Sequence, residues 1–402
     1  MHRRDFLASA ALAASAGLAR ASHAQGYSDP PNRPSGTPRT VPASRLALLA
    51  AGVNLSHWLW LPKEQNADDR WKFIKREELD ALRAAGLSHV RLPLDPASLW
   101  DREAKALRPG AWGEAQYAID LCLAANLAVV LDIHPRGGQS KWIMPDDATG
   151  ATQHLEALWT ALAPRCTQWD AEKVFLEIMN EPHEIKEPGA WAIAQQRVAS
   201  IIRDHCPNHT IIATGDEWGG VGGLKKLDPL DDGNVVYSFH FYEPMTFTHQ
   251  GATWGWEGWK NLRNVPYPCT TQQAKDVAKT IDDEKGRKGL IGEHSDKEEA
   301  KQKFDGWNRD HIAARIDEAA AWSRHNARKG EALPLYCGEF GAIKEFAPQE
   351  SRLAWLKDVA AVCREKKIGW AMWDYCGGFA MSEEKDGKKA LDAQVLRAAL
   401  KR

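Results

Sequence analysis

The chain has 402 residues, of which 44% are hydrophobic and 26% charged, and its formal net charge is −2. This composition excludes a disordered chain, and the near-neutral charge provides no basic surface for nucleic acid or an anionic membrane. Tryptophan is the outlier with 18 residues, and its broad apolar face suits stacking on sugar rings as well as packing in a core.

The first residues have the pattern of an export signal. Arg3 and Arg4 precede an alanine-rich apolar run from Phe6 to Leu18, and a small-x-Ala cleavage site ends at Ala24. We expect residues 1–24 to be a twin-arginine signal peptide, because the apolar run is too short to span a bilayer. The protein should then be periplasmic or secreted, monomeric and without a membrane anchor after cleavage. Residues 25–45 are rich in Pro, Ser and Gly and are predicted to form an N-terminal arm.

From residue 46 onward, short apolar runs with β-branched residues alternate with segments of helical period. The runs cover residues 52–59, 89–94, 128–134, 174–182, 210–215, 235–242, 334–341 and 369–375. Helices are predicted at about 75–86, 114–126, 152–163, 189–205, 308–328 and 351–367. This count predicts a single (β/α)8 TIM barrel over residues 46–402. An open doubly wound sheet is the alternative, but the first run has no glycine-rich phosphate turn after it.

A long interval separates the sixth run from the seventh, and we predict an insertion there at about residues 245–307. Its first half contains Trp254, Trp256 and Trp259, and its second half is strongly charged. Insertions on the loop side of a barrel are where substrate specificity is usually built. For the charged half we expect a solvated surface excursion.

The seven cysteines are scattered along the chain, with no spacing typical of a metal site. Proteins exported by the twin-arginine route cross the membrane already folded, so buried thiols can stay reduced. One or two disulfides are the alternative, and the sequence does not assign them.

The ends of the predicted strands carry polar and aromatic residues. Because the carboxyl ends of all strands meet on one face of a parallel barrel, these residues should converge there. They are Arg91, His134, Asn180, Glu181, His240, Tyr242, Glu339 and Trp373. Glu181 and Glu339 arrive from the fourth and seventh strands, on opposite sides of the mouth. Two carboxyl groups flanking a cleft lined with aromatic residues are the equipment for cleaving a glycosidic bond.

Four motifs recur in order at these strand ends: "NEP" at 180–182, "HFY" at 240–242, "GEFG" at 338–341 and "WAMWDY" at 370–375. With them the sequence resembles glycoside hydrolase family 5, the cellulase-like retaining β-glycosidases, from about Gly52 to Tyr375. The resemblance implies that Glu181 is the general acid/base and Glu339 the nucleophile, without a metal or other cofactor. Retention also implies carboxyl groups roughly 5–5.5 Å apart.

The resemblance assigns supporting roles to the remaining motif residues. Arg91 and Tyr242 would orient Glu339, and Asn180 would hold the sugar 2-hydroxyl. The other members would contact sugar hydroxyls or stack beneath the reacting sugar: His134, His240 and Trp373. We add His57, Trp58 and Trp254 as substrate-binding residues, while Trp60, Trp256 and Trp259 are assigned equally to subsites or to the core.

Several of these residues have alternative explanations. Arg91 is also the kind of residue that lies inside a barrel paired with any carboxylate. His134 follows Asp132, as in some metal sites, but it lacks a second histidine at ligand spacing. Cys337 shares a strand face with Glu339 at a spacing of two, which allows a thiol nucleophile, although packing inside the barrel is favoured.

The sequence therefore predicts an exported retaining endo-β-1,4-glucanase acting on a β-glucan or a related polysaccharide. A β-mannanase, xyloglucanase, xylanase or β-1,3-glucanase is the alternative within the same family. A non-catalytic carbohydrate-binding barrel is an alternative of another class, and it predicts the loss of a glutamate or of its supporting Arg or Tyr. A metal-dependent barrel hydrolase would need clustered His and Asp ligands.

Overall fold

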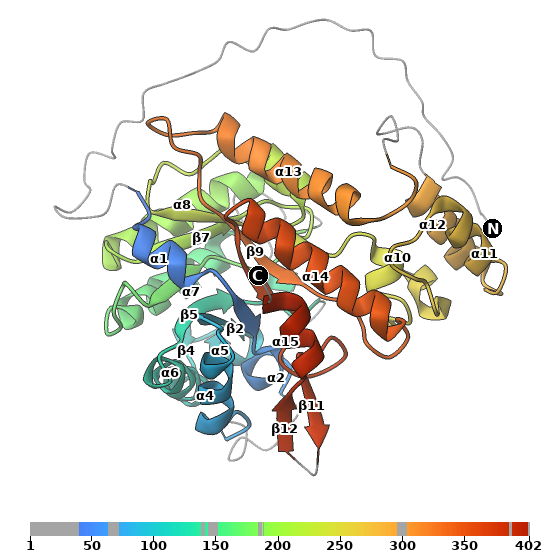
Figure 1. Ribbon diagram of the computed structural model, residues 1–402. Helices are drawn as coiled ribbons and strands as arrows, with labels where there is room; N and C mark the ends of the chain where they lie inside the picture. The colour runs from blue at the N-terminus through green and yellow to red at the C-terminus, as the bar shows by residue number, and fades with distance from the viewer. Residues whose placement is uncertain are drawn as a thin grey trace, which may run out of the picture.

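A closed barrel of eight parallel strands forms the centre of the molecule (Figure 1). The computed structural model describes residues 40–62, 72–137, 141–143, 152–183, 187, 189–295, 304–385 and 388–400. The barrel strands are β1 (Gly52–Asn54), β2 (His89–Leu94), β5 (Ala128–Ile133), β6 (Val174–Glu177), β7 (Thr210–Thr214), β8 (Val235–Phe241), β9 (Leu335–Phe340) and β10 (Gly369–Met372). Their order around the barrel is β1-β10-β9-β8-β7-β6-β5-β2. The predicted (β/α)8 fold is confirmed.

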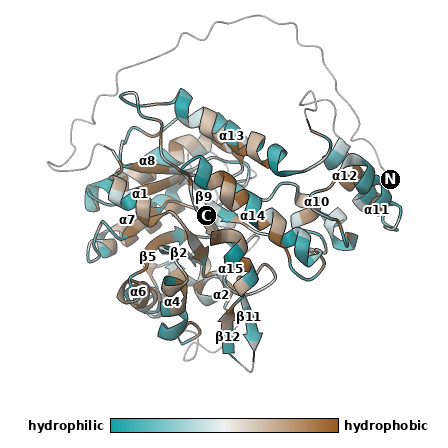
Figure 2. Ribbon diagram, viewed as in Figure 1, coloured by the Kyte–Doolittle hydropathy of each residue, from teal (hydrophilic) through white to brown (hydrophobic). Residues whose placement is uncertain are grey.

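The barrel strands are buried on both faces, which explains why their sequences are nearly continuous apolar runs. Residues pointing inward form one cluster, including Val130, Phe175, Ile212 and Tyr336. Residues pointing outward belong to a larger cluster that they share with the surrounding helices. Figure 2 shows the strands mainly in the hydrophobic colours and more hydrophilic residues on the outer helices.

Helices follow most of the barrel strands, as predicted, with ends that differ from the prediction by a few residues. They are α4 (Arg76–Ala84), α6 (Pro109–Ala124), α7 (Thr152–Cys166), α8 (Ala190–His205), α9 (Val221–Lys226), α13 (Arg309–His325), α14 (Gln349–Glu365) and α15 (Ala393–Leu400). Gly86 follows α4 with φ +102°, a left-handed conformation that suits glycine at a helix end. The sequence did not predict α9 or α15.

The first strand is shorter than predicted. After Asn54 the chain turns into α2 (Ser56–Leu59), so the second half of the run 52–59 is helical. A short apolar run does not distinguish a strand from one helical turn. The remaining short elements are α5 (Pro96–Leu99), β3 (Trp100–Asp101), β4 (Ala106–Leu107), η2 (Lys141–Ile143), β11 (Ser382–Lys385) and β12 (Lys388–Leu391).

The segment between β8 and β9 forms a compact helical layer. It contains α10 (Met245–Thr248), η3 (Glu257–Asn261), α11 (Thr271–Ala278) and α12 (Glu284–Ser295), and Figure 1 shows α11 and α12 at one edge of the molecule. Leu290 and His294 on α12 are fully buried, and the Glu293 carboxylate accepts hydrogen bonds from the backbone of Met245 and Thr246. Residues 284–295 of the charged half therefore form a packed helix, and the prediction of a solvated excursion is wrong for them, while residues 296–303 lie outside the described residues.

At the end of the barrel where the strands begin, α1 (Ala43–Leu48) directly precedes β1. It occupies the last residues of the segment that we predicted as an N-terminal arm. Arg45 anchors it by an ion pair of 2.7 Å to Glu172. The predicted signal peptide lies outside the described residues. Across the described ranges, no helix combines the length and apolar character needed to cross a bilayer. All seven cysteines have buried thiols.

Candidate active site

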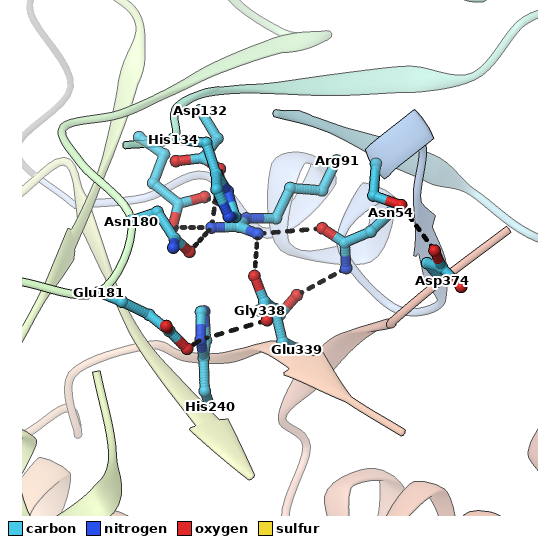
Figure 3. Close-up of polar contacts among 12 residues, drawn as sticks. Asn54, Arg91, Asp132, His134, Asn180, Glu181, His240, Gly338, Glu339 and Asp374 are labelled. Atoms are coloured by element: carbon cyan, nitrogen blue, oxygen red, sulfur yellow. Dashed lines mark hydrogen bonds and ion pairs between the residues drawn. The ribbon is translucent and has the colours of Figure 1, made fainter. Parts of the chain in front are cut away.

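Arg91 lies at the centre of the strand ends and joins several carboxylates (Figure 3). From β2, it donates from Nε and Nη2 to the two oxygens of Glu177, at 2.7 and 2.9 Å. It also donates from Nη1 to Glu339 Oε1 at 2.7 Å. Both Arg91 and Glu177 are buried, and a buried guanidinium with bidentate geometry holds its partners in fixed positions.

Three further side chains complete the surroundings of Arg91. Its guanidinium donates to the side-chain oxygens of Asn54 and Asn180, at 3.0 and 2.8 Å, and lies 3.0 Å from Asp132 Oδ2. Three carboxylates thus surround one cation away from water. Burial raises the pKa of Glu177, and it raises the pKa of Asp132 to about 7.

Our reading of the sequence did not include Glu177, Asp132 or Asn54 in the site. For the first two, the period of the strands carries a signal. Glu177 is two residues after Phe175, and Asp132 is two residues after Val130, so both share the inward parity of the barrel interior. A carboxylate at such a position needs a buried cation, and Arg91 has the same parity on β2.

Glu339, at the end of β9, is held by two donors. Besides Arg91, the Tyr242 hydroxyl donates to its Oε2 at 2.8 Å, and His240 Nδ1 lies 3.6 Å from the same oxygen. Its side chain is 6% exposed. Burial raises the pKa of Glu339, while the neighbouring His240 and Arg91 oppose that rise.

A β-bulge aims Glu339 into the mouth. The pairing of β8 with β9 runs from Phe239 opposite Cys337 to His240 opposite Glu339, with a register shift between them. Cys337 points outward and packs in the cluster that includes Cys363. Contrary to our expectation, Cys337 therefore neither shares a face with Glu339 nor packs inside the barrel, and burial raises the pKa of its thiol.

Glu181 faces Glu339 from the loop after β6. Its backbone is left-handed, with φ +43°, and His240 Nδ1 lies 2.7 Å from its Oε1. Burial raises the pKa of Glu181 to about 7, although its side chain keeps 26% exposure. Burial also lowers the pKa of His240. A neutral imidazole and a carboxyl group of raised pKa suit the exchange of a proton at this oxygen.

The two glutamates are close together. The ligand atoms of Glu181, His240 and Glu339 all lie within 4.8 Å of one another. At this separation one carboxyl group can attack the anomeric carbon of a glycosidic bond while the other protonates the leaving oxygen. The space between the two groups is too small for an additional water molecule. In the described part of the chain these three residues are also the group whose geometry fits a metal ion, although a hydrogen bond already joins Glu181 to His240.

Two aromatic rings and a histidine border the carboxylates. His134 Nδ1 lies 2.6 Å from Asp132 Oδ2, and the His134 ring stacks on Trp373 at 5.5 Å. Trp60 contacts both rings, at 4.4 Å from His134 and 5.5 Å from Trp373. The hydrogen bond with Asp132 accounts for the placement of His134, and burial lowers the pKa of its imidazole.

The remaining predicted tryptophans divide between core and surface. Trp58 is 0% exposed and packs in the main core, so the prediction that it contacts substrate is wrong. Trp256 lies against Gly258 and Gly289, where an added Cβ would come within 2.1 Å of its ring. Trp254 is 56% exposed, and its ring lies 6.5 Å from Phe379.

One exposed tryptophan escaped our reading of the sequence. Trp218, in the loop after β7, is 54% exposed and stacks on His183 at 5.0 Å, with 8° between the ring planes. His183 follows Glu181 closely and lies 2.6 Å from its backbone oxygen. The loop "GDEWGG" ends a predicted strand and contains a tryptophan, which is a signal that could have identified Trp218.

A parallel barrel with paired glutamates and aromatic rings at its mouth is the architecture of a glycoside hydrolase. Comparison with known protein families identifies the family of this chain. The model of the cellulase family, glycosyl hydrolase family 5, matches residues 56–328, and the chain belongs to that family. The resemblance noted in the motifs is thereby confirmed.

Curated relatives and solved structures agree with this family. Endoglucanase 3 of Fibrobacter succinogenes is 27% identical over 83% of this chain, which spans 50% of that protein's length. Endoglucanase C of Acetivibrio thermocellus is 26% identical over 81% of this chain and 90% of its own length. Cel5A of Thermotoga maritima in complex with cellobiose aligns over 89% of this chain and 99% of its own, with TM-score 0.68 and 27% identity. The same enzyme with mannotriose gives TM-score 0.69 at the same identity and the same two coverages.

Proposed function

We propose that this protein is a retaining endo-β-1,4-glucanase, with Glu339 as nucleophile and Glu181 as general acid/base. The observation that carries the proposal is the approach of the two carboxyl groups within 4.8 Å, each in different surroundings. Retaining glycosidases have carboxyl groups about 5–5.5 Å apart, and inverting ones about 6.5–9.5 Å apart. The contact distance supports the first mechanism.

In the first step, Glu339 attacks the anomeric carbon and the bond to the leaving oxygen breaks. Arg91 and the Tyr242 hydroxyl fix both oxygens of this carboxylate, which limits its rotation during attack. The positive charge of Arg91 also favours the ionised nucleophile against the effect of burial. The product is a glycosyl-enzyme ester.

Glu181 gives its proton to the leaving oxygen in the same step. With its pKa near 7, a large share of the enzyme holds this proton at neutral pH. Once Glu339 is esterified, its negative charge is gone, and the pKa of Glu181 falls because the two groups are coupled. Glu181 then removes a proton from the water that hydrolyses the ester.

Three more side chains are positioned to hold the reacting sugar. Asn180, whose oxygen is already engaged by Arg91, directs its amide donors toward other groups, and the family role is a bond to the sugar 2-hydroxyl. Trp373 offers a stacking floor, and His134 a hydroxyl partner. No step of this sequence requires a metal or another cofactor.

Cellulose-type β-1,4-glucan is the proposed substrate because the relatives named above are endoglucanases. A β-mannanase is the second candidate, since the Thermotoga maritima enzyme was solved with mannotriose as well as with cellobiose. We also propose a periplasmic or secreted location. For that location the support is the pair Arg3 and Arg4 ahead of an alanine-rich run. Replacing both with lysine should keep the chain in the cytoplasm on cell fractionation.

The test is reducing-sugar release from carboxymethylcellulose, barley β-glucan, xyloglucan, glucomannan, galactomannan, xylan and laminarin. Wild type is compared with Glu181→Gln, Glu339→Gln and the control Glu172→Gln, which lies at the other end of the barrel with Arg45. Both site variants should lose more than about 10³-fold in rate while the control keeps full activity. Proton NMR of the first product should show the β-anomer. Activity on mannan alone would change the substrate, and an active Glu339→Gln variant would refute the mechanism.

A further inference from the structure

A second polar cluster lies beside the catalytic residues, where the neighbouring strands β1 and β10 end. Ser56 and His57 begin α2 directly after β1, and Asp374 follows β10. In Figure 3, Asp374 lies beside Asn54, on the opposite side of Glu339 from Glu181. None of these three residues takes part in the mechanism above.

The contacts in this cluster are short. Ser56 Oγ donates to Asp374 Oδ2 at 2.6 Å, and His57 Nδ1 lies 3.1 Å from the same oxygen. The Ser56 hydroxyl is also 2.8 Å from His57 Nδ1. Because the single hydrogen of the Ser56 hydroxyl goes to Asp374, the Ser56 oxygen accepts a proton from His57 Nδ1, and the other ring nitrogen, Nε2, is then the acceptor in the neutral imidazole.

Burying the Asp374 carboxylate at this position costs free energy of folding, which indicates a functional reason for it. Its side chain is 1% exposed, and its Oδ1 has no hydrogen-bond partner among the described residues. A buried carboxylate with a hydroxyl and an imidazole as partners costs free energy, which an amide or an apolar residue would avoid. Such a group is typical of a site in which a carboxylate fixes the orientation and tautomer of a histidine.

The free edge of His57 is kept open. The His57 side chain is 20% exposed, and its polar contacts with Ser56 and Asp374 both use Nδ1. Gly377 faces the other edge, and a Cβ there would come within 2.4 Å of His57 Cε1 and 3.1 Å of Nε2. Its φ of +120° suits glycine alone, so the loop after β10 passes the imidazole without covering Nε2.

The helix that carries His57 leads directly to a tryptophan of the site. Trp60 is three residues further and therefore on the same side of the helical turn. The Trp60 ring contacts Trp373, the proposed sugar floor, at 5.5 Å. A sugar next to the one on Trp373 would bring its hydroxyls within reach of His57.

We infer that Asp374 and Ser56 are positioning residues that hold His57 to bind a hydroxyl of a sugar one subsite away from the cleaved bond. This inference rests on the proposed function for its kinetic consequence. His57 is then a substrate-binding residue, and Asp374 acts through it without touching substrate.

The kinetic test uses cello-oligosaccharides and the variants Asp374→Asn, His57→Ala and the double variant. Each single variant should raise KM about tenfold with kcat within about twofold, since one hydrogen bond between His57 and a sugar hydroxyl is lost or misaligned. The double variant should be no worse than His57→Ala, because Asp374 acts through that ring. Asp232→Asn, a buried aspartate paired with Arg203, is the matched control and should lower stability without raising KM. A fall in kcat at unchanged KM, or a further tenfold loss in the double variant, would overturn the inference.

A second readout does not depend on turnover. Nitrogen-15 NMR of His57 should show the proton on Nδ1 in wild type, and its loss from Nδ1 in Asp374→Asn. If Asp374→Asn does not fold, Ser56→Ala keeps the carboxylate and should shift the same signal. A wild-type proton on Nε2 would refute the positioning role even if the protein hydrolysed no glycan at all.

Discussion

Replacing Glu177 with glutamine should separate its role in holding Arg91 from the chemistry of the catalytic glutamates. In the native protein two charge-assisted hydrogen bonds, of 2.7 and 2.9 Å, join Glu177 to Arg91 with both side chains fully buried. A glutamine retains one acceptor oxygen and turns its amide donors toward the guanidinium, so at most one of the two bonds survives.

Breaking a buried ion pair by changing one partner costs about 3–5 kcal/mol. Arg91 keeps its contacts with Glu339 and Asp132, so we expect the lower end, about 3 kcal/mol. The control is Glu172→Gln, which breaks the pair with Arg45 but has a half-exposed carboxylate. Because exposed pairs contribute little, that variant should lose about 0–1 kcal/mol.

Glu177→Gln should also change the pH profile of kcat/KM. The negative charge of Glu177 raises the pKa of Glu181, so its removal lets Glu181 ionise at lower pH. Since the proposed acid must be protonated, the alkaline limb of kcat/KM, which we expect near pH 7 in wild type, should move toward acid. The measurements are urea unfolding and kcat/KM from pH 4 to 9. A loss of less than about 1 kcal/mol with an unmoved alkaline limb would refute our account of how Arg91 is held.

Three further predictions follow from the site and the core. Tyr242→Phe removes the donor at 2.8 Å from Glu339, so it should lower kcat about 10–100-fold and shift the acid limb of the pH profile upward, because the ionised carboxylate loses a hydrogen bond. Unchanged kinetics would show that the Tyr242 hydroxyl does not contribute to catalysis. Burial lowers the pKa of His89 to about 3, against 6.5 as its ordinary value. Between those values the unfolded chain binds the extra proton, so His89 costs stability as the pH falls below 6.5, by up to about 1.4 kcal/mol per pH unit. In urea unfolding at pH 7, 6 and 5, the stability of wild type relative to His89→Gln should therefore decline toward pH 5, and a constant difference would contradict the assigned shift. Dialysis against EDTA should leave hydrolysis unchanged, whereas loss of activity that Zn²⁺ or Mn²⁺ restores would assign a metal to the group of Glu181, His240 and Glu339.

The barrel strands, and the polar residues at their ends, could be predicted from the sequence because both depend on local sequence patterns. A strand buried on both faces needs a run of apolar, β-branched residues, and its end is visible where polar residues interrupt that run. The residues Arg91, Asn180 and Glu339 lie at such interruptions. Because parallel strands of one barrel all end on one face, the sequence also predicted that these side chains would meet.

Other features depended on packing between segments far apart in the chain. Trp58 and Trp254 are both tryptophans in loop-side segments, yet one is fully buried and the other more than half exposed. A tryptophan satisfies either environment, so its residue type does not decide between them. Likewise, α12 in the charged half of the insertion is a packed helix because Leu290 is buried in the main apolar cluster.

The sequence by itself determined the fold class, the family motifs and the pair of glutamates, since each depends on local periodicity and on residues at the ends of strands. Only the tertiary structure decided which partners surround them. The contacts of Arg91 with Glu177 and Asp132, the bulge that turns Glu339 inward, and the contact of Ser56 with Asp374 join strands separated by tens to hundreds of residues. Such contacts exist because the closed barrel brings the first strand beside the last. It also buries charged side chains, which are stable there only when they form ion pairs or hydrogen bonds with one another.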